Sequence, residues 1–511
     1  MVAIALGVLA VVVVHDDYGI TWDEPAHSIY GDLVRAYFLS GGTDHRGDAF
    51  LNLRYYGAVA DLVPSLLHPA NDLAKYQIRH LVCGVFALAT LLATWTFARL
   101  GPGRWLPTLA VLALATMPRF VGHAFDNLKD IPFAGAVAGF VAAMTALAAA
   151  RDGRTWRLLV CGLAAGFLLA VRPGGLPVLL LLFFGCTIAA DATIGRRGGP
   201  AMSIRFAVIL AIGWVLMVLP WPWAHASPIL RPAEAVWMAS RFPFSPRVLY
   251  AGAVMPSIEL PRTYYPWMLL ITTPPIVLGL ALLGLAQTAA TLRTDRTSPA
   301  AHFQAVTALW FLLPLAAIIV THPNVYDGIR HVLFVLPPLA VLAAIGATTL
   351  AALVPPRARV VATLGTAALL CAPLPDLIRL HPYQTTYFNQ LVGGLAGAEG
   401  RYETDYWVAS YGEAFAWVNA RARETPSRPV RVLLAGTGYL LPIAEVYAGP
   451  NVHAKVIQQV PPARTLPPGV DYCIATARFG YATSLFPDAP IVHRIGRDGT
   501  VFTVIRGRAP S

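Results

Sequence analysis

Apolar segments of membrane-spanning length recur along most of this chain and constrain its fold more than any other feature. A run of about 20 apolar residues is long enough to cross the hydrocarbon core of a bilayer as a helix. Since a spanning segment must satisfy its own backbone hydrogen bonds, these runs are expected to be α-helical. The sequence predicts a polytopic α-helical membrane protein with about eleven transmembrane helices. The predicted spans are roughly 1–14, 78–98, 105–121, 131–150, 156–171, 174–190, 206–224, 267–287, 302–320, 332–351 and 360–375.

The distribution of charge predicts an orientation. Only 13% of the 511 residues are charged and the net charge is +11, whereas soluble domains carry about 25% charged residues. Much of the positive excess lies in short loops on one side of the predicted spans, which is the positive-inside pattern and not a nucleic-acid-binding surface. That side is therefore predicted to be cytoplasmic. Its arginines are Arg99, Arg104, Arg151, Arg154, Arg157, Arg196, Arg197, Arg205, Arg293, Arg296, Arg357 and Arg359.

The opposite side carries two long loops, 15–77 and 225–266, and two short ones, 122–130 and 321–331. Met1–Val14 lacks a basic start and a small-residue cleavage site, so it is predicted to be a first span and not a cleaved signal peptide. Two stripes at helical spacing in the first loop either lie in the membrane interface or pack against their own neighbours. The stripes are Ile29, Leu33, Val34, Tyr37 and Phe38, and Val59, Leu62, Val63, Leu66 and Leu67.

After about residue 376 the hydropathy falls, and residues 376–511 are predicted to form a soluble α/β domain on the outer side. Val430–Ala435 and Val470–Ala475 have the composition of short strands. Ile491–Ile505 is predicted to be a hairpin that turns at Arg497-Asp498-Gly499. No catalytic motif is recognisable in this tail.

The first polar cluster, Thr21–His27, follows directly after the first apolar run. Thr21 and Glu24 fit a capping box, and Pro25 suits a first helical turn. Asp23 is predicted to be a general base, because a carboxylate near a low-dielectric boundary has its pKa raised toward neutrality. Glu24 is a second acidic candidate, and His27 shares the helical face of Asp23.

The second cluster, Gly122–Asp130, packs polar and ionisable residues into a short outer loop. Asp130 precedes a predicted span and is explained by helix capping alone. Asp126 has no such local role. Lys129 is one of only three lysines in the chain, the others being Lys75 and Lys455. Asp126 and Lys129 are therefore candidate functional residues.

The third cluster, Thr321–His331, ends where an outer loop enters a span. Arg330 at that point could bind a phosphate through two parallel hydrogen bonds, with His331 beside it. The alternative for Arg330 is interfacial snorkelling. The three clusters together would supply a base, further carboxylates and phosphate-binding cations. Transfer from a lipid-linked phosphate donor needs this combination, because a hydroxyl loses a proton while the departing phosphate gains charge.

In this arrangement the chain resembles the C-type (GT-C) glycosyltransferase superfamily, and more closely its protein O-mannosyltransferase and lipid A aminoarabinose transferase branch. The resemblance covers roughly residues 1–375. It rests on the Asp23–Glu24 pair, the acidic loop from Asp126 to Asp130, and Arg330 at the start of a late span. Downstream, His381-Pro382-Tyr383-Gln384 and Glu403-Thr404-Asp405-Tyr406-Trp407 are similar to bacterial, largely uncharacterised members.

The resemblance implies an inverting single displacement at the anomeric carbon of a polyprenyl-phosphate sugar. It implies that Asp23 is the base and that Asp126 is a second acidic residue in the cavity. Arg330, with Lys129 or His331, would hold the donor phosphate.

The resemblance also implies partners and a location. The expected partners are the lipid-linked donor, an acceptor protein, lipid or glycan, and the bilayer of a bacterial inner membrane. The active site and tail would be extracytoplasmic, and His27 and Asp130 would also line the substrate site. Some relatives use a divalent metal ion. His27, Glu24 and Asp126 could supply ligands, but no spacing here demands a metal.

Two other classes are compatible with the sequence. A transporter or lipid-linked sugar flippase would place ionisable residues near the bilayer midplane, whereas the clusters here lie at outer span ends. A non-catalytic assembly protein that binds through its tail would keep its function after Asp23→Asn. The sequence identifies neither the sugar nor the acceptor.

Overall fold

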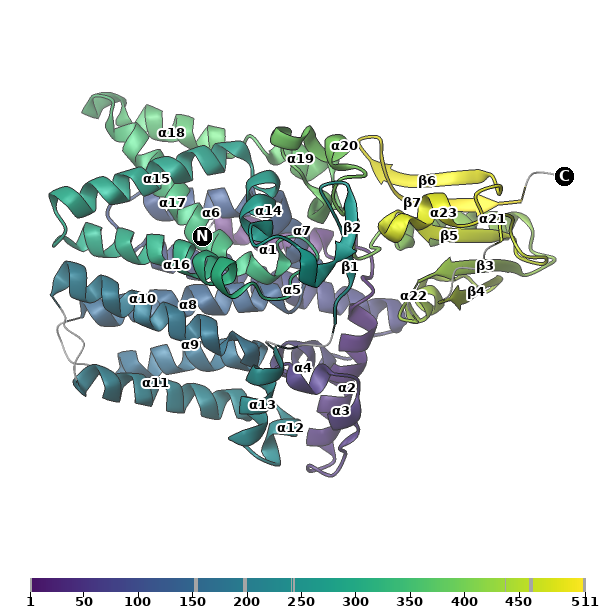
Figure 1. Cartoon of the computed structure of the whole chain (residues 1–511), viewed down its shortest axis with the longest axis horizontal. Helices are drawn as coiled ribbons and strands as arrows, with labels where there is room; N and C mark the ends of the chain where they lie inside the picture. The colour runs from purple at the N-terminus through teal and green to yellow at the C-terminus, as the bar shows by residue number, and fades with distance from the viewer. Residues whose placement is uncertain are drawn as a thin grey trace.

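The computed structural model consists of a helical part, on the left of Figure 1, and a smaller tail built around a sheet, on the right. It describes residues 2–150, 155–195, 200–239, 241, 244–436, 438–458 and 463–508. The polytopic helical fold with a C-terminal α/β domain is confirmed.

Every predicted span contains helical structure, although 206–224 and 267–287 are each divided between two helices. Among the described residues, seven helical stretches are long and apolar enough to cross a membrane, and the bent pair α6–α7 makes an eighth. The helices α9 and α11 are apolar but shorter. The helices of this part are α1 (Val2–Val14), α5 (Asp72–Ala98), α6 (Leu106–Ala115), α7 (Pro118–Asp126), α8 (Asp130–Ala149), α9 (Trp156–Val171), α10 (Leu176–Ile194), α11 (Pro200–Val218), α14 (Tyr264–Thr272), α15 (Pro275–Thr294), α16 (Pro299–Thr321), α17 (Leu336–Ala352), α18 (Arg359–Leu370) and α19 (Leu374–Arg379).

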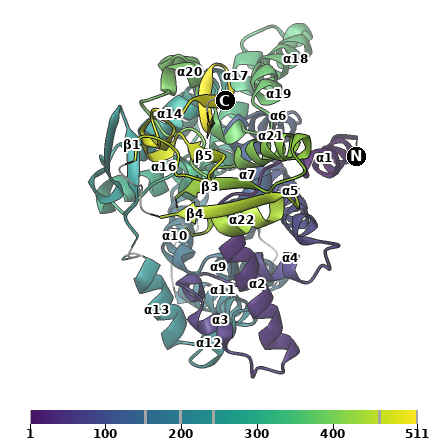
Figure 2. The same cartoon turned by 90° about the vertical axis from the view of Figure 1, so that its right-hand side faces the viewer.

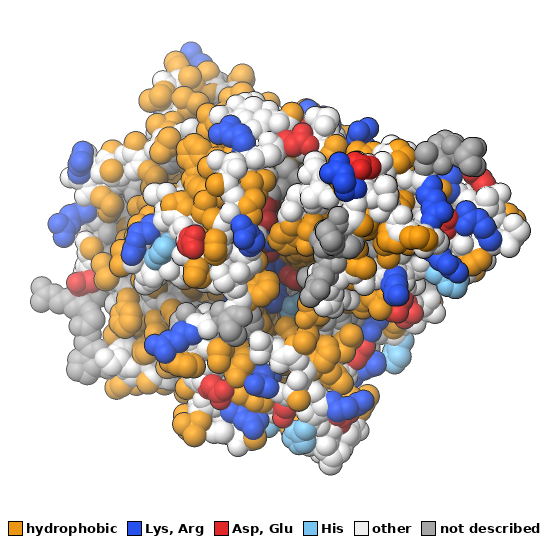
Figure 3. Space-filling view, turned by 45° about the vertical axis from the view of Figure 1, so that its right-hand side comes forward, with side chains coloured by type: hydrophobic (Ala, Val, Ile, Leu, Met, Phe, Trp, Pro, Cys, Tyr) orange, Lys and Arg blue, Asp and Glu red, His pale blue; other side chains and the backbone are white. Residues whose placement is uncertain are grey.

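The outer faces of these helices are apolar. In Figure 3 hydrophobic side chains cover much of the helical part, whereas charged side chains are more frequent toward the tail. Large exposed side chains on several helices include Val85, Leu92, Ile188, Val215, Leu282, Val320 and Val361. Such surfaces are stable when lipid covers them.

The predicted span 105–121 and the loop 122–130 are divided differently in the structure. The α6 and α7 helices meet at a 69° bend, and most of the predicted loop is the helix α7. The cause is Pro118, which disfavours helical geometry in the preceding residue, and Met117 is extended (φ −76°, ψ 113°). Asp126 therefore ends a helix inside the protein and does not lie in an exposed loop.

The helix α17 is almost entirely buried at the centre of the bundle. Gly284 on α15 and Gly346 on α17 lie so close to the facing backbones that a Cβ would clash with the carbonyl oxygens of Leu342 and Leu280. Small residues allow this approach between membrane helices. Just before α17, the 3-10 helix η4 (Arg330–Val335) packs beside α8, so the chain at Arg330 is held by its surroundings.

The loops with the predicted cytoplasmic arginines join the ends of α5–α6, α8–α9, α10–α11, α15–α16 and α17–α18. Of these arginines, Arg151, Arg154, Arg196 and Arg197 lie outside the described residues. The α8–α9 loop follows the end of α8, and the α17–α18 loop follows the end of α17. Asp130 instead starts α8, and Arg330 starts η4, which leads directly into α17. The three polar clusters and the basic loops are thus at opposite ends of the bundle.

Between α1 and α5 the chain forms α2 (Glu24–Leu39), α3 (Arg46–Ala49) and α4 (Val59–Ser65). The first apolar stripe lies on α2, and the second lies on α4 and the two residues after it. The two helices pack so closely that a Cβ on Gly31 would clash with the Asp61 backbone. Val34 is buried and Phe38 is exposed, so the first stripe both packs internally and faces outward. The segment after α11 forms α12 (Pro222–His225), α13 (Leu230–Ala239) and the hairpin β1 (Arg247–Tyr250) with β2 (Ala253–Pro256).

The tail contains a five-stranded mixed sheet of order β4-β3-β5-β7-β6. The predicted strand at 430–435 and the predicted hairpin are present, and Asp498 and Gly499 have the positive φ angles (51° and 79°) that a tight hairpin turn needs. Seen from the tail side in Figure 2, β3 and β4 cross in front of the bundle. The elements are α20 (Gly394–Ala398), α21 (Tyr411–Glu424), β3 (Val430–Ala435), α22 (Leu440–Tyr447), β4 (Val452–Ile457), β5 (Tyr472–Thr476), α23 (Tyr481–Ser484), β6 (Ile491–Arg497) and β7 (Thr500–Gly507).

The tail and the start of the chain share a core. Residues from Leu380 to Tyr402 pack with the helical part, whereas the hydrophobic core of the sheet domain begins at Val408. That second core also contains Ile20, and Trp22 packs against it. The segment just before Asp23 is therefore packed against the sheet domain, and the predicted boundary at 376 lies well before the sheet domain's own core.

Candidate active site

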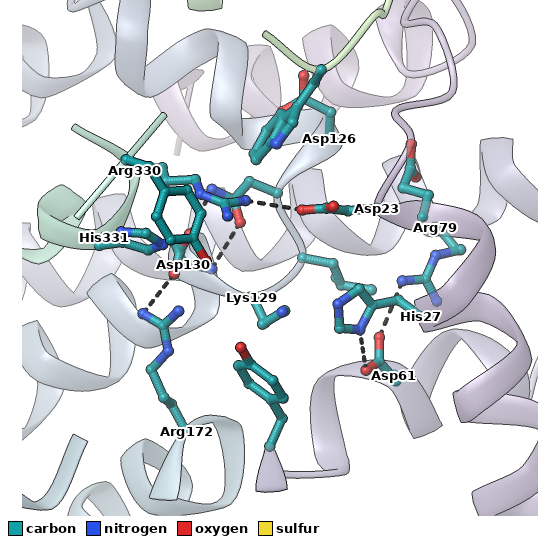
Figure 4. A pocket seen from close by; sticks show the side chains of 16 residues that line it. Asp23, His27, Asp61, Arg79, Asp126, Lys129, Asp130, Arg172, Arg330 and His331 are labelled. Atoms are coloured by element: carbon teal, nitrogen blue, oxygen red, sulfur yellow. Dashed lines mark hydrogen bonds and ion pairs between the residues drawn. The ribbon is translucent and has the colours of Figure 1, made fainter. Parts of the chain in front are cut away.

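A pocket opens where the ends of several helices meet the α2–α4 segment and the tail (Figure 4). The cavity that its side chains leave is about 40 Å³, room for one or a few water molecules. All the residues singled out from the sequence line it, although they come from three distant clusters. They are Asp23, Glu24, His27, Asp126, Lys129, Asp130, Arg330 and His331.

The start of α2 is fixed by Glu24. Its side chain accepts hydrogen bonds from the Thr21 backbone N–H (2.8 Å) and hydroxyl (3.2 Å), and lies 3.1 Å from His80 Nε2. One half of the predicted capping box is thus formed, with Pro25 in the first turn. Both carboxylate oxygens of Glu24 thus have partners. The adjacent carboxylate, that of Asp23, is the one that remains accessible from the pocket.

Asp23 forms an ion pair with Arg330, and the Oδ2–Nη1 distance is 2.9 Å. The Asp23 side chain is 41% exposed and that of Arg330 is 12% exposed, which leaves the carboxylate accessible from the pocket. The guanidinium also lies over the rings of Tyr326 and Trp407, at 5.0 and 5.3 Å from their centroids. The second terminal nitrogen of Arg330, Nη2, lies 3.3 Å from Asp327 Oδ2.

The pKa of Asp23 is lower than its ordinary value. Burial by itself would raise it, but the positive charges of Arg330 and Lys129 outweigh burial. The expectation of a pKa raised toward neutrality is therefore wrong for the pocket in this state, because it considered the low-dielectric boundary and not the arginine. Asp23 is an ionised carboxylate held by a cation.

Lys129 enters the pocket from the turn between α7 and α8. Its Nζ lies 4.0 Å from the centroid of the Tyr56 ring, and no carboxylate of the described chain is within ion-pair distance of it. Burial lowers the pKa of Lys129 to about 8, although Asp23 partly opposes this. Tyr56 is placed by Gly57, which lies against the backbone of Ala170 with no room for a Cβ.

Asp130 begins α8 and fixes a further cation. Its Oδ1 is 2.8 Å from Nη1 of Arg172, and its Oδ2 accepts a hydrogen bond from the Asn127 amide (3.1 Å). Asn127 in turn accepts from the Asp130 backbone N–H. Asp130 thus holds Arg172 at the pocket wall, opposite Asp23 in Figure 4.

His27 belongs to a buried group beneath the pocket. Its Nδ1 is 2.8 Å from Asp61 Oδ2, and Asp61 Oδ1 is 3.1 Å from Arg79. Burial lowers the pKa of His27 despite Asp61, so the imidazole is neutral at neutral pH. Burial would raise the pKa of Asp61, but His27 and Arg79 reverse the shift. Asp61 is the centre of this group.

Asp126 and His331 lie at two edges of the pocket. Asp126 is buried, its Oδ1 makes no hydrogen bond among the described residues, and His123 Nδ1 lies 3.9 Å from it. His331 is bonded through Nδ1 to the Tyr265 hydroxyl at 3.0 Å.

Sequence reasoning missed several residues that line the pocket. Arg172 had a readable signal, since it interrupts an apolar region on the predicted outer side, where arginine is disfavoured. Trp407 belongs to the Glu403–Trp407 string of the family resemblance, where it had no assigned role. Asp327, which contacts Arg330, belongs to the third polar cluster and likewise had none. The overlooked lining residues are Tyr56, Asp61, Arg79, Asn127, Leu128, Arg172, Tyr326 and Trp407.

The pocket combines one accessible carboxylate with the cations Lys129, Arg172 and Arg330, while a fourth cation, Arg79, is held by the buried Asp61. Such a site can bind an anion and accept a proton beside it. Within the described residues, no group of three or more His, Cys, Asp or Glu side chains is placed to hold a metal ion. His27 and Glu24, considered as ligands, have other partners, Asp61 and His80.

The class of fold, a polytopic helical membrane part followed by a soluble tail, is shared with solved structures. The chain is similar to the apo structure of ArnT from Cupriavidus metallidurans, with 13% identity and a TM-score of 0.52 over the whole chain and 99% of ArnT. It is also similar to archaeal oligosaccharyltransferase AglB from Archaeoglobus fulgidus in complex with an inhibitory peptide and a dolichol-phosphate. There the identity is 11% and the TM-score 0.51, over 92% of this chain and 68% of AglB.

A further oligosaccharyltransferase structure from Archaeoglobus fulgidus, tethered to an acceptor peptide, has a TM-score of 0.53 at 11% identity, over 96% of this chain and 70% of that one. At these identities the likeness establishes the fold. No protein-family model and no curated protein matches the sequence.

Proposed function

We propose that the protein is a membrane glycosyltransferase. It would move a sugar from a polyprenyl-phosphate donor to an acceptor hydroxyl on the extracytoplasmic side by inverting displacement. The observation that carries the proposal is the 2.9 Å pair between Asp23 and Arg330 in a pocket that Lys129 and Arg172 also line. The GT-C fold supports it, as does the dolichol-phosphate named in the similar AglB complex.

The donor phosphate would bind among the three cations. A phosphate accepts two hydrogen bonds from a guanidinium in the way a carboxylate does, so it competes with Asp23 for Arg330. Lys129, which has no carboxylate partner in the part of the chain that the structure describes, would contribute a point charge. Donor binding would therefore release Asp23 from its ion pair.

Release would also prepare Asp23 for chemistry. A bound phosphate offsets the charge of Arg330, so the effect that lowers the Asp23 pKa weakens and its proton affinity rises. Asp23 would then take the hydroxyl proton as the acceptor oxygen attacks the anomeric carbon. The bond from that carbon to the phosphate oxygen breaks, and its electron pair leaves with polyprenyl phosphate, which the cations stabilise. The configuration at the carbon is inverted.

The other predicted residues would act around this step. Asp126 would be a second acidic residue facing the acceptor, and His331 would line the phosphate side. Glu24 would fix the start of α2, and Asp130 would hold Arg172. His27 would line the substrate site through its contact with Asp61.

The location of the pocket supports an enzyme over a transporter or flippase. Its charged residues lie at the ends of α8, α9 and η4, and not at their middles, where transport sites are built. We place the pocket and the tail outside a bacterial inner membrane, since the basic loops are at the opposite end.

The test uses purified, lipid-reconstituted protein and a panel of polyprenyl-phosphate sugars, including hexose and aminopentose donors with protein, lipid and glycan acceptors. Transfer or donor hydrolysis by the wild type, lost in folded Asp23→Asn, is the expected result. It would also distinguish an O-mannosyltransferase-like from an aminoarabinose-transferase-like enzyme. Full activity of Asp23→Asn would remove Asp23 as the base, and no turnover of any donor would contradict the proposed class.

A further inference from the structure

Arg478 of the tail reaches the supports of the pocket. It follows β5, its side chain is only 3% exposed, and its guanidinium lies against two aromatic rings that stack on each other. The distances to the centroids of Trp22 and Phe479 are 4.7 and 5.0 Å. Trp22 immediately precedes Asp23, and its backbone N–H donates to the Trp407 carbonyl at 3.2 Å.

The polar contacts of Arg478 lead to Arg330. Arg478 donates to Asp327 Oδ1 at 2.7 Å, while Asp327 Oδ2 is 3.3 Å from Arg330. Arg478 also donates to the backbone carbonyl of Tyr406, the residue before Trp407. Its Nε is 3.1 Å from Glu403. One tail arginine thus contacts the carboxylate that binds Arg330 and the backbone that carries the ring beneath it.

The backbone around Arg478 is held in rarely populated geometry. Asp327, Val408 and Phe479 have φ angles of 57°, 56° and 60°, a region that non-glycine residues, above all β-branched or bulky ones, rarely adopt. Such conformations persist only where surrounding contacts impose them, and they concentrate at functional sites. Asp327 binds Arg478, Phe479 directly follows it, and Val408 is two residues after Tyr406, whose carbonyl accepts from Arg478.

We propose that Arg478 is a positioning residue of the pocket, which sets the Arg330 guanidinium for the donor phosphate through Asp327 and the Tyr406–Trp407 backbone. The inference rests on the proposed function, because it assigns Arg330 to the donor phosphate. It adds a role for the tail, which supplies a contact that the helical part lacks.

The charges explain why the contact matters. Asp327 divides its two oxygens between Arg478 and Arg330. Without Arg478, Asp327 can turn both oxygens to Arg330 and draw it away from the Asp23 side of the pocket. Glu403 and Asp327 would also lose the cation that they share. Two buried carboxylates would then lack that partner, which is energetically costly. A displacement of about 1 Å in a positioning group can cost on the order of 100-fold in rate.

Arg506 provides a matched control in the same domain. It is also a buried arginine, but its guanidinium donates only to backbone carbonyls of the tail, those of Pro487, Ala489 and Ala482. Arg506→Gln removes a buried guanidinium from the tail without touching the pocket. It therefore measures what a purely structural loss does to the enzyme.

The experiment compares Arg478→Gln and Arg506→Gln in the full-length, lipid-reconstituted protein, measuring polyprenyl phosphate binding, kcat and KM for donor and acceptor, and thermal stability. We expect Arg478→Gln to weaken polyprenyl phosphate binding and raise the donor KM about 10- to 100-fold, with the acceptor KM within about twofold. Arg506→Gln is expected to lower stability and leave donor binding within about twofold. Should Arg478→Gln fail to fold, Arg478→Lys carries the same test, because lysine keeps the charge without the planar fork.

The double variant with Asp327→Asn tests the route. If Arg478 acts through Asp327, the two losses in donor affinity are less than additive. Equal effects of Arg478→Gln and Arg506→Gln, or additive losses, would overturn the positioning role while leaving the proposed function intact. A wild type that neither binds polyprenyl phosphate nor turns over any donor would overturn both.

Discussion

Two of the carboxylate–arginine pairs that line the pocket, Asp23–Arg330 and Asp61–Arg79, differ in what can reach them. The Asp23–Arg330 distance is 2.9 Å with Asp23 41% exposed, whereas the Asp61–Arg79 distance is 3.1 Å with both side chains no more than 5% exposed. Asp61 is further occupied by His27, and Asp23 has one oxygen without a comparable partner.

The comparison shows that an ion pair's accessibility matters more to its role than its length. An open pair can exchange one partner for a ligand of like charge. A sealed pair cannot, and breaking it leaves an unpaired buried charge. Asp23–Arg330 therefore has the properties of a binding and catalytic pair, and Asp61–Arg79 those of a structural one. Each variant below tests this contrast.

The largest expected effect separates the two aspartates. Asp23→Asn should lower kcat by about 10²–10⁴, the range for loss of a general base, with stability nearly unchanged. Asp61→Asn should instead lower the free energy of unfolding by about 3–5 kcal/mol and keep most transfer activity per folded molecule. Single-turnover rates and thermal unfolding of both variants measure this. Equal loss of chemistry in a stable Asp61→Asn protein would break the distinction.

The two arginines should separate in donor affinity. Arg330→Gln removes hydrogen bonds to a charged phosphate and should weaken donor binding by about 1.5–3 kcal/mol. Arg79→Gln should leave donor affinity close to wild type and lower stability. Titration with polyprenyl phosphate checks both. Tight binding by Arg330→Gln would move the phosphate site to Lys129 and Arg172.

Lys129 should make donor capture depend on pH. The pKa of Lys129 is about 8, lowered from 10.5, so its positive charge is lost as pH rises through about 8. The donor kcat/KM, which reports the free enzyme, should fall across that interval. Lys129→Arg keeps its charge at high pH and should abolish the fall. An identical alkaline decline in Lys129→Arg would assign it to another group.

The smallest expected effect concerns the ring beneath the open pair. Trp407→Leu removes one face from Arg330 and should weaken donor binding by about 0.5–1 kcal/mol. Trp95, whose ring lies 4.7 Å from Arg99 at the far end of α5, is the control. Trp95→Leu should not change donor binding, and equal losses in both would point to a general packing effect.

Much of the fold follows from the sequence because hydropathy and charge act over whole segments. The apolar runs mark the helices, and arginines in alternate loops sort the loop ends into two groups. From that sorting alone, Asp23, Lys129 and Arg330 are predicted to lie at the same end of the bundle. The hairpin at Asp498-Gly499 was readable because its turn needs residues that tolerate positive φ.

The rest depended on contacts between distant segments. The lowered pKa of Asp23 comes from Arg330, more than three hundred positions away in the chain, and no local pattern encodes that pairing. Asp61 lies in an apolar stripe, where its partners His27 and Arg79 cannot be inferred from spacing. Arg478 lies in no motif recognised in the sequence, so its contact with Asp327 appears only in the folded protein.

The packing of Ile20 and Trp22 against the tail has a consequence for biosynthesis. The segment that carries Asp23 is made before β5 and Arg478, which follow more than 400 residues later. The first segment therefore lacks its packing partners until the sheet domain has been made and placed beside it. A chain cut between the helical part and the sheet domain would lack these contacts, so the activity proposed here would require the sheet domain.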